Sequence, residues 1–145
     1  MSWYLPEGLP APATHSDGLS APYWEATRRE KLAIQFCRGC QHWQWGPEWI
    51  CHRCHSFDLD WREVDGKGVI YSYQRIWHPV HPALAGHGPY IAALVELLAA
   101  DRIRMIGNLL GDPKQEVPIG GAVEAVFEHH EAANPPFSLV HWRLV

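Results

Sequence analysis

Short segments of alternating apolar and polar residues fill the second half of the chain. This period-two pattern is typical of strands that bury one face, and turn residues such as Gly, Pro, Asn and Asp separate the segments. The pattern predicts five strands, at residues 67–77, 90–97, 102–110, 122–129 and 137–144. Five short strands in succession favour a small barrel, so we expect a five-stranded OB-fold.

The chain begins differently, with a segment at residues 1–22 in which prolines recur. Proline favours extended backbone. The segment also has four large apolar side chains, Trp3, Tyr4, Leu5 and Leu9. Such groups are poorly placed in a free tail, so we expect the segment to be extended and to lie over the folded body.

A short helix is predicted next, at residues 22–31. Ser20 is the expected N-cap, Pro22 suits the first turn, and the basic residues at 28–31 suit the C-terminal end of a helix. Residues 32–36 are then predicted to form a strand that leads into the first cysteine pair. The predicted fold class is therefore mainly β with a short N-terminal helix.

Four cysteines form two identically spaced pairs, Cys37-x-x-Cys40 and Cys51-x-x-Cys54, with ten residues between the pairs. Two intervening residues let one tight turn aim both sulfurs at one point, and two such knuckles complete a tetrahedral site. We expect a zinc ribbon with a structural ion, because protein ligands would fill all four positions. Iron is the alternative metal, and two disulfides are disfavoured in a reducing compartment.

The charge balance bears on the choice of partner. Twelve Lys and Arg residues stand against sixteen Asp and Glu residues, a formal net charge of −4. A chain this acidic lacks the basic surface of a general nucleic-acid binder. The longest apolar stretch, at 90–100, is too short for a bilayer, which needs about 20 residues. Without a secretory leader either, we expect no membrane association and a cytoplasmic location.

A series of short motifs follows in order from residue 20 to residue 145. They are Tyr23-Trp24, the two cysteine pairs around Pro47, Gly66-x-Gly68-x-x-Tyr71-Ser72, Pro89-Tyr90-x-x-Ala93-Leu94-Val95-Glu96-Leu97, and Ile119-Gly120 before Val123-x-x-x-Phe127. This order resembles the DUF35 family, whose members combine an N-terminal helical segment, a rubredoxin-like zinc ribbon and an OB-fold associated with acyl-CoA metabolism. In one departure, Gln41 and His55 replace the glycine that often follows the second cysteine of a knuckle.

The resemblance implies three parts, an N-terminal segment at 1–35, a zinc ribbon at 36–62 and an OB-fold at 63–145. It also implies a role as a non-catalytic accessory subunit that joins a thiolase-like partner in a hetero-oligomer. Such a partner would be a thiolase or an aldolase that cleaves CoA thioesters, including those of steroid side chains. Direct contact of this chain with acyl-CoA stays open.

The residues agree with a role without catalysis. We find no G-x-S-x-G elbow, no glycine-rich phosphate loop and no nucleophile beside an evident base, so no catalytic residue is assigned. Tyr23, Trp24, Trp77 and His78 are the candidates for a partner or ligand surface. Two other functions stay open, a nucleic-acid-binding ribbon and barrel and electron transfer through iron in the cysteine site.

Two further clusters have simpler interpretations. Arg102 and Arg104 lie two apart, so on a strand they share a face, where they could meet a CoA phosphate or a carboxylate. A solvent-facing pair is the preferred interpretation. His129, His130 and Glu131 suggest half a metal site, but adjacent histidines point to opposite faces of a strand. A solvated strand end is therefore expected there.

Overall fold

The computed structural model describes residues 8–14 and 17–145, so Trp3, Tyr4 and Leu5 of the predicted extended segment lie outside the described residues. One α-helix, α1 (Ala21–Arg28), precedes the strands. The strands are β1 (Leu32–Cys37), β2 (His42–Gln44), β3 (Leu59–Val64), β4 (Lys67–Ile76), β5 (Tyr90–Leu97), β6 (Ile103–Leu109), β7 (Ala122–His130) and β8 (Phe137–Leu144). Two short 3₁₀ helices, η1 (Pro82–Leu84) and η2 (Leu98–Ala100), flank β5.

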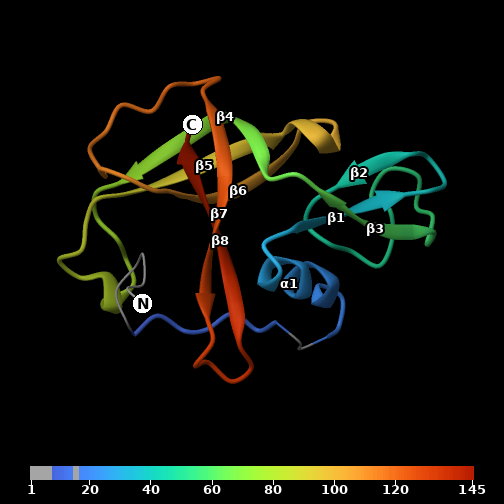
Figure 1. Cartoon of the computed structure of the whole chain (residues 1–145), viewed down its shortest axis with the longest axis horizontal. Helices are drawn as coiled ribbons and strands as arrows, with labels where there is room; N and C mark the ends of the chain where they lie inside the picture. Colours follow the sequence, from blue (N-terminus) through green and yellow to red (C-terminus); the bar gives the residue numbers. More distant parts are fainter. Residues whose placement is uncertain (1–7, 15–16) are drawn as a thin grey trace.

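The strands form two sheets (Figure 1). An antiparallel three-stranded sheet in the order β2-β1-β3 carries the cysteine pairs. The other five strands close into a barrel in the order β4-β5-β6-β8-β7. Strands β6 and β8 pair in parallel, with Asn108 opposite His141 and Leu109 opposite Trp142, whereas the other strand pairs of the barrel in the described residues are antiparallel. The predicted fold class and the five predicted barrel strands are thus confirmed.

Two strands were not predicted, β2 and β3. β2 has three residues, too few for an alternation to register. In β3, the charged residues Asp60, Arg62 and Glu63 interrupt the alternation of apolar and polar residues by which a strand is predicted. The strand forms nonetheless because it pairs along the whole of β1, with Leu32 opposite Val64 and Cys37 opposite Leu59.

The helix is shorter than predicted and ends at Arg28. Glu30 takes a left-handed conformation, with φ of 58°, and the backbone N–H of Lys31 donates to Ala26 O at 3.0 Å, which closes the helix early. Ser20 occupies the predicted N-cap position, but its hydroxyl forms no capping hydrogen bond. It accepts a hydrogen bond from Trp24 Nε1 at 3.2 Å instead.

One apolar core joins the helix, the three-stranded sheet and the barrel. Trp142 is fully buried in it, together with Leu32 and Ile34 of β1. In Figure 1 helix α1 lies below the three-stranded sheet and beside β8, and it contacts β1, β7 and β8. Within the described residues, no helix combines the length and apolar character needed to cross a bilayer.

Two glycines of the Gly66-x-Gly68 motif let β4 approach its neighbours closely. A Cβ atom at Gly66 would lie 2.7 Å from Ala125 Cβ on β7. One at Gly68 would lie 2.7 Å from the Glu96 carbonyl oxygen on β5 and would also collide with Val95. Since real Cβ contacts do not reach these distances, glycine is required at both positions for the barrel to close as it does.

Candidate metal centre

The two cysteine pairs meet at one end of the three-stranded sheet. Cys37 ends β1, Cys40 lies in the turn before β2, and Cys51 and Cys54 lie in the loop before β3. The Sγ atoms of Cys37 and Cys54 are 3.6 Å apart, and those of Cys40 and Cys51 are 3.7 Å apart. All four sulfurs lie within 4.8 Å of one another. The cysteines are not disulfide-bonded.

These distances suit a metal ion. Tetrahedral coordination at about 2.3 Å from metal to sulfur places the sulfurs about 3.8 Å apart. The two shortest separations are close to that value, whereas a disulfide would need about 2.05 Å. The four clustered cysteines could therefore hold a metal ion.

The two knuckles have the same backbone shape despite the missing glycines. Gln41 N donates to Cys37 O at 2.7 Å, and His55 N donates to Cys51 O at 2.9 Å. Gln41 and His55, each directly after the second cysteine, have φ of 59° and 63°. This is the left-handed region that favours glycine. Both residues are therefore held in a backbone conformation that costs free energy. The departure from the family pattern leaves the knuckle geometry intact.

The thiols differ in acidity because their surroundings differ. The backbone N–H of Cys54 lowers the pKa of Cys51 to about 6, and the N–H of Arg53, 3.4 Å from Cys51 Sγ, contributes in the same direction. Desolvation raises the pKa of Cys40 to about 12, with further contributions from the neighbouring thiols. Packed thiolates repel one another, and a divalent cation would offset that repulsion.

A buried pair of amides holds the loop between the knuckles. Gln35 on β1 donates to Glu48 O at 3.0 Å and accepts from Glu48 N at 3.1 Å. Gln44 on β2 accepts from His52 N at 3.1 Å. The loop that carries Cys51 is thus tied to the strand that carries Cys37. Nothing in the sequence pattern singled out these glutamines.

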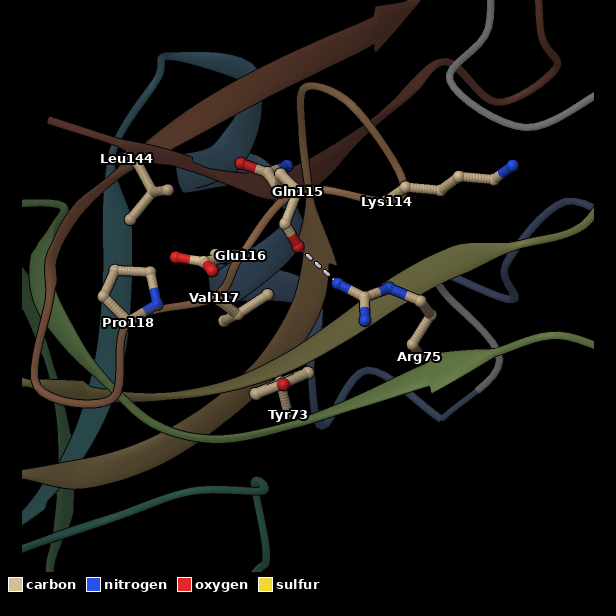
Figure 2. Close-up of a pocket in the computed structure, with 8 residues that line it drawn as sticks. All are labelled: Tyr73, Arg75, Lys114, Gln115, Glu116, Val117, Pro118 and Leu144. Atoms are coloured by element: carbon tan, nitrogen blue, oxygen red, sulfur yellow. Dashed lines mark hydrogen bonds between the residues drawn. The ribbon is translucent and has the colours of Figure 1, made fainter.

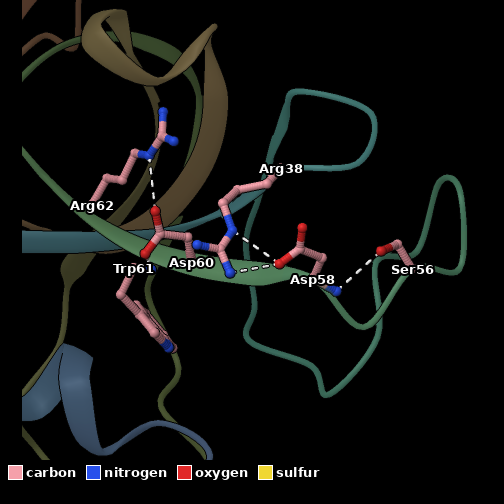
Figure 3. A network of polar contacts seen from close by, with 6 residues as sticks. All are labelled: Arg38, Ser56, Asp58, Asp60, Trp61 and Arg62. Carbon is pink, nitrogen blue, oxygen red and sulfur yellow. Dashed lines mark hydrogen bonds and ion pairs between the residues drawn. The ribbon is translucent and has the colours of Figure 1, made fainter.

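A second network ties the outer rim of the site together (Figure 3). Arg38, inside the first knuckle, donates to Asp58 Oδ1 through two nitrogens, at 2.9 and 2.6 Å. The backbone N–H of Asp58 in turn donates to Ser56 Oγ at 3.0 Å. Both charged side chains are about half exposed, so water screens the pair and it contributes little to stability.

The candidate surface residues fall into two separate groups. Tyr23 is only 8% exposed, and its ring meets those of Trp24 and Trp45 edge-on, at centroid distances of 5.1 and 4.9 Å. This contact joins the helix to the three-stranded sheet. Trp77, 54% exposed, and the exposed His78 lie in the loop between β4 and η1.

The two histidines at the end of β7 differ from expectation. His130 is buried, stacks on Phe137 and lies 3.0 Å from Glu128 Oε2, so the predicted solvated strand end is wrong there. Its neighbour His129 contacts Ser138 Oγ and Glu30 Oε1. His141 on β8 lies 3.4 Å from the same Glu128 carboxylate. The alternation of β7 could not show this cluster, because His141 comes from another strand.

Four exposed arginines form ion pairs with carboxylates of this chain. Arg28 pairs with Glu131 at 3.0 Å, and Arg29 pairs with Glu63 at 2.7 Å. Arg102 and Arg104 share Glu96.

A cavity of about 550 Å³ opens beside β4 (Figure 2). Arg75 spans its edge, donating to the carbonyl oxygens of Pro113, at 2.9 Å, and Gln115. These bonds attach the loop before β7 to the barrel. Tyr73, Val117 and Leu144 supply apolar walls. Because its guanidinium is engaged by the loop, Arg75 acts in the structure as a loop anchor.

Comparison with known proteins identifies the family. The model for the ChsH2 C-terminal OB-fold domain matches residues 61–128. A solved structure described as an Ltp2-ChsH2(DUF35) aldolase contains a chain that is 36% identical to this one, with a TM-score of 0.71. That match covers 92% of this chain and 98% of the other. The chain belongs to the DUF35 family.

Two other relatives extend this finding. A DUF35 protein of unknown function from Sulfolobus solfataricus has the same fold, with a TM-score of 0.59 at 14% identity over 92% of this chain and 90% of that one. A protein of Thermomonospora curvata described as a "probable enoyl-CoA hydratase alpha subunit" is 39% identical over 111 residues, which are 77% of this chain. This DUF35 chain spans 33% of that relative's length.

Proposed function

We propose that this DUF35 chain is an accessory subunit that binds a thiolase-like protein and supports the turnover of acyl-CoA thioesters by the assembly. One observation carries the proposal, the 36% identity over 98% of a chain from the Ltp2-ChsH2(DUF35) aldolase. The similarity to a hydratase subunit supports the same class of substrate, since enoyl-CoA is an acyl-CoA thioester. The partner would be an aldolase or thiolase subunit, and steroid side-chain thioesters are one substrate class that fits.

In this proposal the chain supplies structure and the partner supplies the chemistry of bond breaking. The ribbon, at 36–62, and the OB-fold, at 63–145, act as one body because they share a core with helix α1. Trp77 and His78 are the proposed contact with the partner or ligand, since both are exposed on one loop. Tyr23 and Trp24 would act there by holding the helix in place.

The experiment is co-purification. The chain is co-expressed with thiolase-like proteins from its own genome, one of them tagged, and the assembly is assayed for cleavage of acyl-CoA thioesters. We expect a stable complex whose activity exceeds that of the partner alone. Trp77→Ala should weaken the complex, whereas Trp49→Ala, which removes another exposed indole on the ribbon, serves as the control. A folded, metal-loaded chain that binds none of these proteins would contradict the proposal.

We also propose that Cys37, Cys40, Cys51 and Cys54 bind a structural zinc ion. The sulfur separations and the four-thiolate donor set support it. In this role the ion holds the two knuckles together and has no position left for substrate. Reduced thiols suit a reducing compartment, for which we propose the cytoplasm. Elemental analysis decides between zinc and iron, and iron would give a coloured protein.

A further inference from the structure

A cavity of about 310 Å³ lies where the ribbon meets the barrel. The ribbon contributes Trp43, Gln44, Trp45 and His52, and the barrel contributes Arg102, Ile103 and Arg104. Its volume is at the lower end of the range for ligand sites, about 300–1,000 Å³. The cavity suits one head group of a larger molecule, and it exists only because the two sheets pack together.

The charges at this cavity leave a net positive site. Arg102 lies 3.3 Å from Glu96 Oε1, and Arg104 lies 3.6 Å from Glu96 Oε2. One carboxylate therefore serves two guanidinium groups. Asp101 neighbours Arg102 in the chain but does not line the cavity. Each guanidinium has five N–H donors, so most donors remain for an anionic ligand.

Both arginines are held in position before any ligand arrives. The Arg104 guanidinium lies 3.6 Å from the centre of the Tyr71 ring, which covers one of its faces. Asp101 and Arg102 both take left-handed backbone conformations, with φ of 50° and 59°. Two consecutive non-glycine residues in that region are uncommon and costly. This turn presents the Arg102 side chain next to Arg104, beside the ribbon.

The opposite wall is aromatic and equally fixed. Trp43 meets Phe36 edge-on at 5.0 Å, and Trp45 meets the buried Tyr23 at 4.9 Å. Indole faces stack with planar rings, and guanidinium groups bind phosphate through paired hydrogen bonds. A cavity with both features matches a ligand that joins a phosphate to a flat heterocycle.

We propose that this cavity binds the phosphorylated adenosine end of an acyl-CoA thioester, with Arg102 and Arg104 on phosphate and the adenine against Trp43 or Trp45. The choice of CoA among nucleotides rests on the proposed function, whereas the phosphate-and-ring chemistry rests on the cavity itself. In this arrangement the chain would hold the nucleotide end while the thioester extends toward the partner.

The test uses the purified full chain and isothermal titration calorimetry with adenosine 3′,5′-bisphosphate. We expect saturable binding, at least about tenfold weaker in the Arg102→Gln/Arg104→Gln double variant, because charged hydrogen bonds to phosphate are lost. Glu96→Gln should strengthen binding, since it frees both guanidinium groups. Arg143→Gln on β8 is the matched control, because Arg143 is an exposed arginine paired with Glu124 on the barrel. It should leave affinity unchanged.

Further probes separate the sources of affinity. Adenosine and inorganic phosphate should each bind at least about tenfold more weakly than the bisphosphate. Equal binding of inorganic phosphate, equal loss in Arg143→Gln, or no binding at millimolar bisphosphate would overturn the proposal. Melting temperature and metal content of each variant exclude unfolding as the cause of a loss. Co-purification with the partner is a separate readout, so failure of that complex with intact nucleotide binding would overturn the accessory role and not this site.

Discussion

Gln44 Nε2 donates a hydrogen bond of 2.8 Å to Gln35 Oε1 in the interior of the three-stranded sheet. The two residues are direct cross-strand neighbours on β2 and β1, and both are almost fully buried. Their remaining amide groups bind the backbone of Glu48 and His52. The pair thus holds the two cysteine knuckles in place relative to each other. The geometry of the candidate metal site therefore depends on residues that are not metal ligands.

Gln44→Leu should destabilise the chain by about 1–3 kcal/mol, because it removes the hydrogen bonds of the Gln44 side chain to Gln35 Oε1 and to the His52 backbone N–H, at about 0.5–1.5 kcal/mol each. Metal affinity should fall about 10- to 100-fold, as is usual when groups that orient ligands are lost. Urea unfolding and competition with a chromophoric chelator measure the two effects. Gln74→Leu, at an exposed position of β4, should change neither. Equal behaviour of both variants would refute the role given to the pair.

Cys37→Ser should remove the metal and destabilise the ribbon together, since ligation free energy is folding free energy in such sites. The expected loss is several kcal/mol, measured by thermal unfolding alongside elemental analysis. The neighbouring Arg38→Gln breaks only the exposed pair with Asp58, so it should leave the melting temperature nearly unchanged and the metal retained. A Cys37→Ser chain with wild-type metal content and melting temperature would rule out this account.

Gln41→Gly and His55→Gly should each stabilise the chain by about 1 kcal/mol, because glycine adopts the left-handed conformation of these positions without strain. Part of the gain is offset by the greater freedom of glycine in the unfolded chain. Chemical denaturation of the metal-loaded protein is the measurement. Arg53→Gly, at a knuckle position without positive φ, should destabilise instead. A loss of stability in both Gln41→Gly and His55→Gly would contradict this prediction.

Gly68→Ala should destabilise the barrel by at least about 1–3 kcal/mol, because the added methyl group would overlap Val95 and the backbone of β5. The neighbouring β4 position Ser72 is exposed, and Ser72→Ala should stay within about 0.5 kcal/mol of the original chain. Thermal unfolding of the two variants provides the comparison. If Gly68→Ala proves neutral, strand β4 can move away from β5 more easily than the structure indicates.

Stability should fall as the pH drops below about 6.5, the ordinary value for histidine. Burial lowers the pKa of His141, while the nearby Glu128 carboxylate opposes this shift and His130 adds to it. The unfolded chain therefore takes up the proton at a higher pH than the folded chain does, so the stability present above the unfolded pKa is lost as the pH falls through the folded pKa. His141→Gln should flatten the profile between pH 7 and pH 5, whereas the exposed His87→Gln should not. Unfolding midpoints across that range would show an unchanged slope if His141 were not involved.

The barrel strands and the cysteine knuckles could be predicted from the amino-acid sequence alone. Each barrel strand buries one face, so consecutive residues alternate between apolar and polar. The Cys-x-x-Cys spacing brings two sulfurs together through local backbone geometry alone. Strand β3 was not predicted because its charged residues interrupt the apolar–polar alternation. It forms through pairing with β1. The predicted helix was too long because basic residues suit its C-terminal end without showing where the chain turns. The left-handed conformation of Glu30 ends the helix earlier.

The contacts between residues far apart in the sequence could be found only from the folded chain. The amide pair Gln35–Gln44, the buried Glu128–His130–His141 cluster and the cavity between Trp45 and Arg104 each combine residues from different strands. Their positions follow from sheet register and from the packing of two sheets on one core, which are set by the sum of many contacts. No short window of sequence contains that sum, so these sites became visible only when the chain was folded.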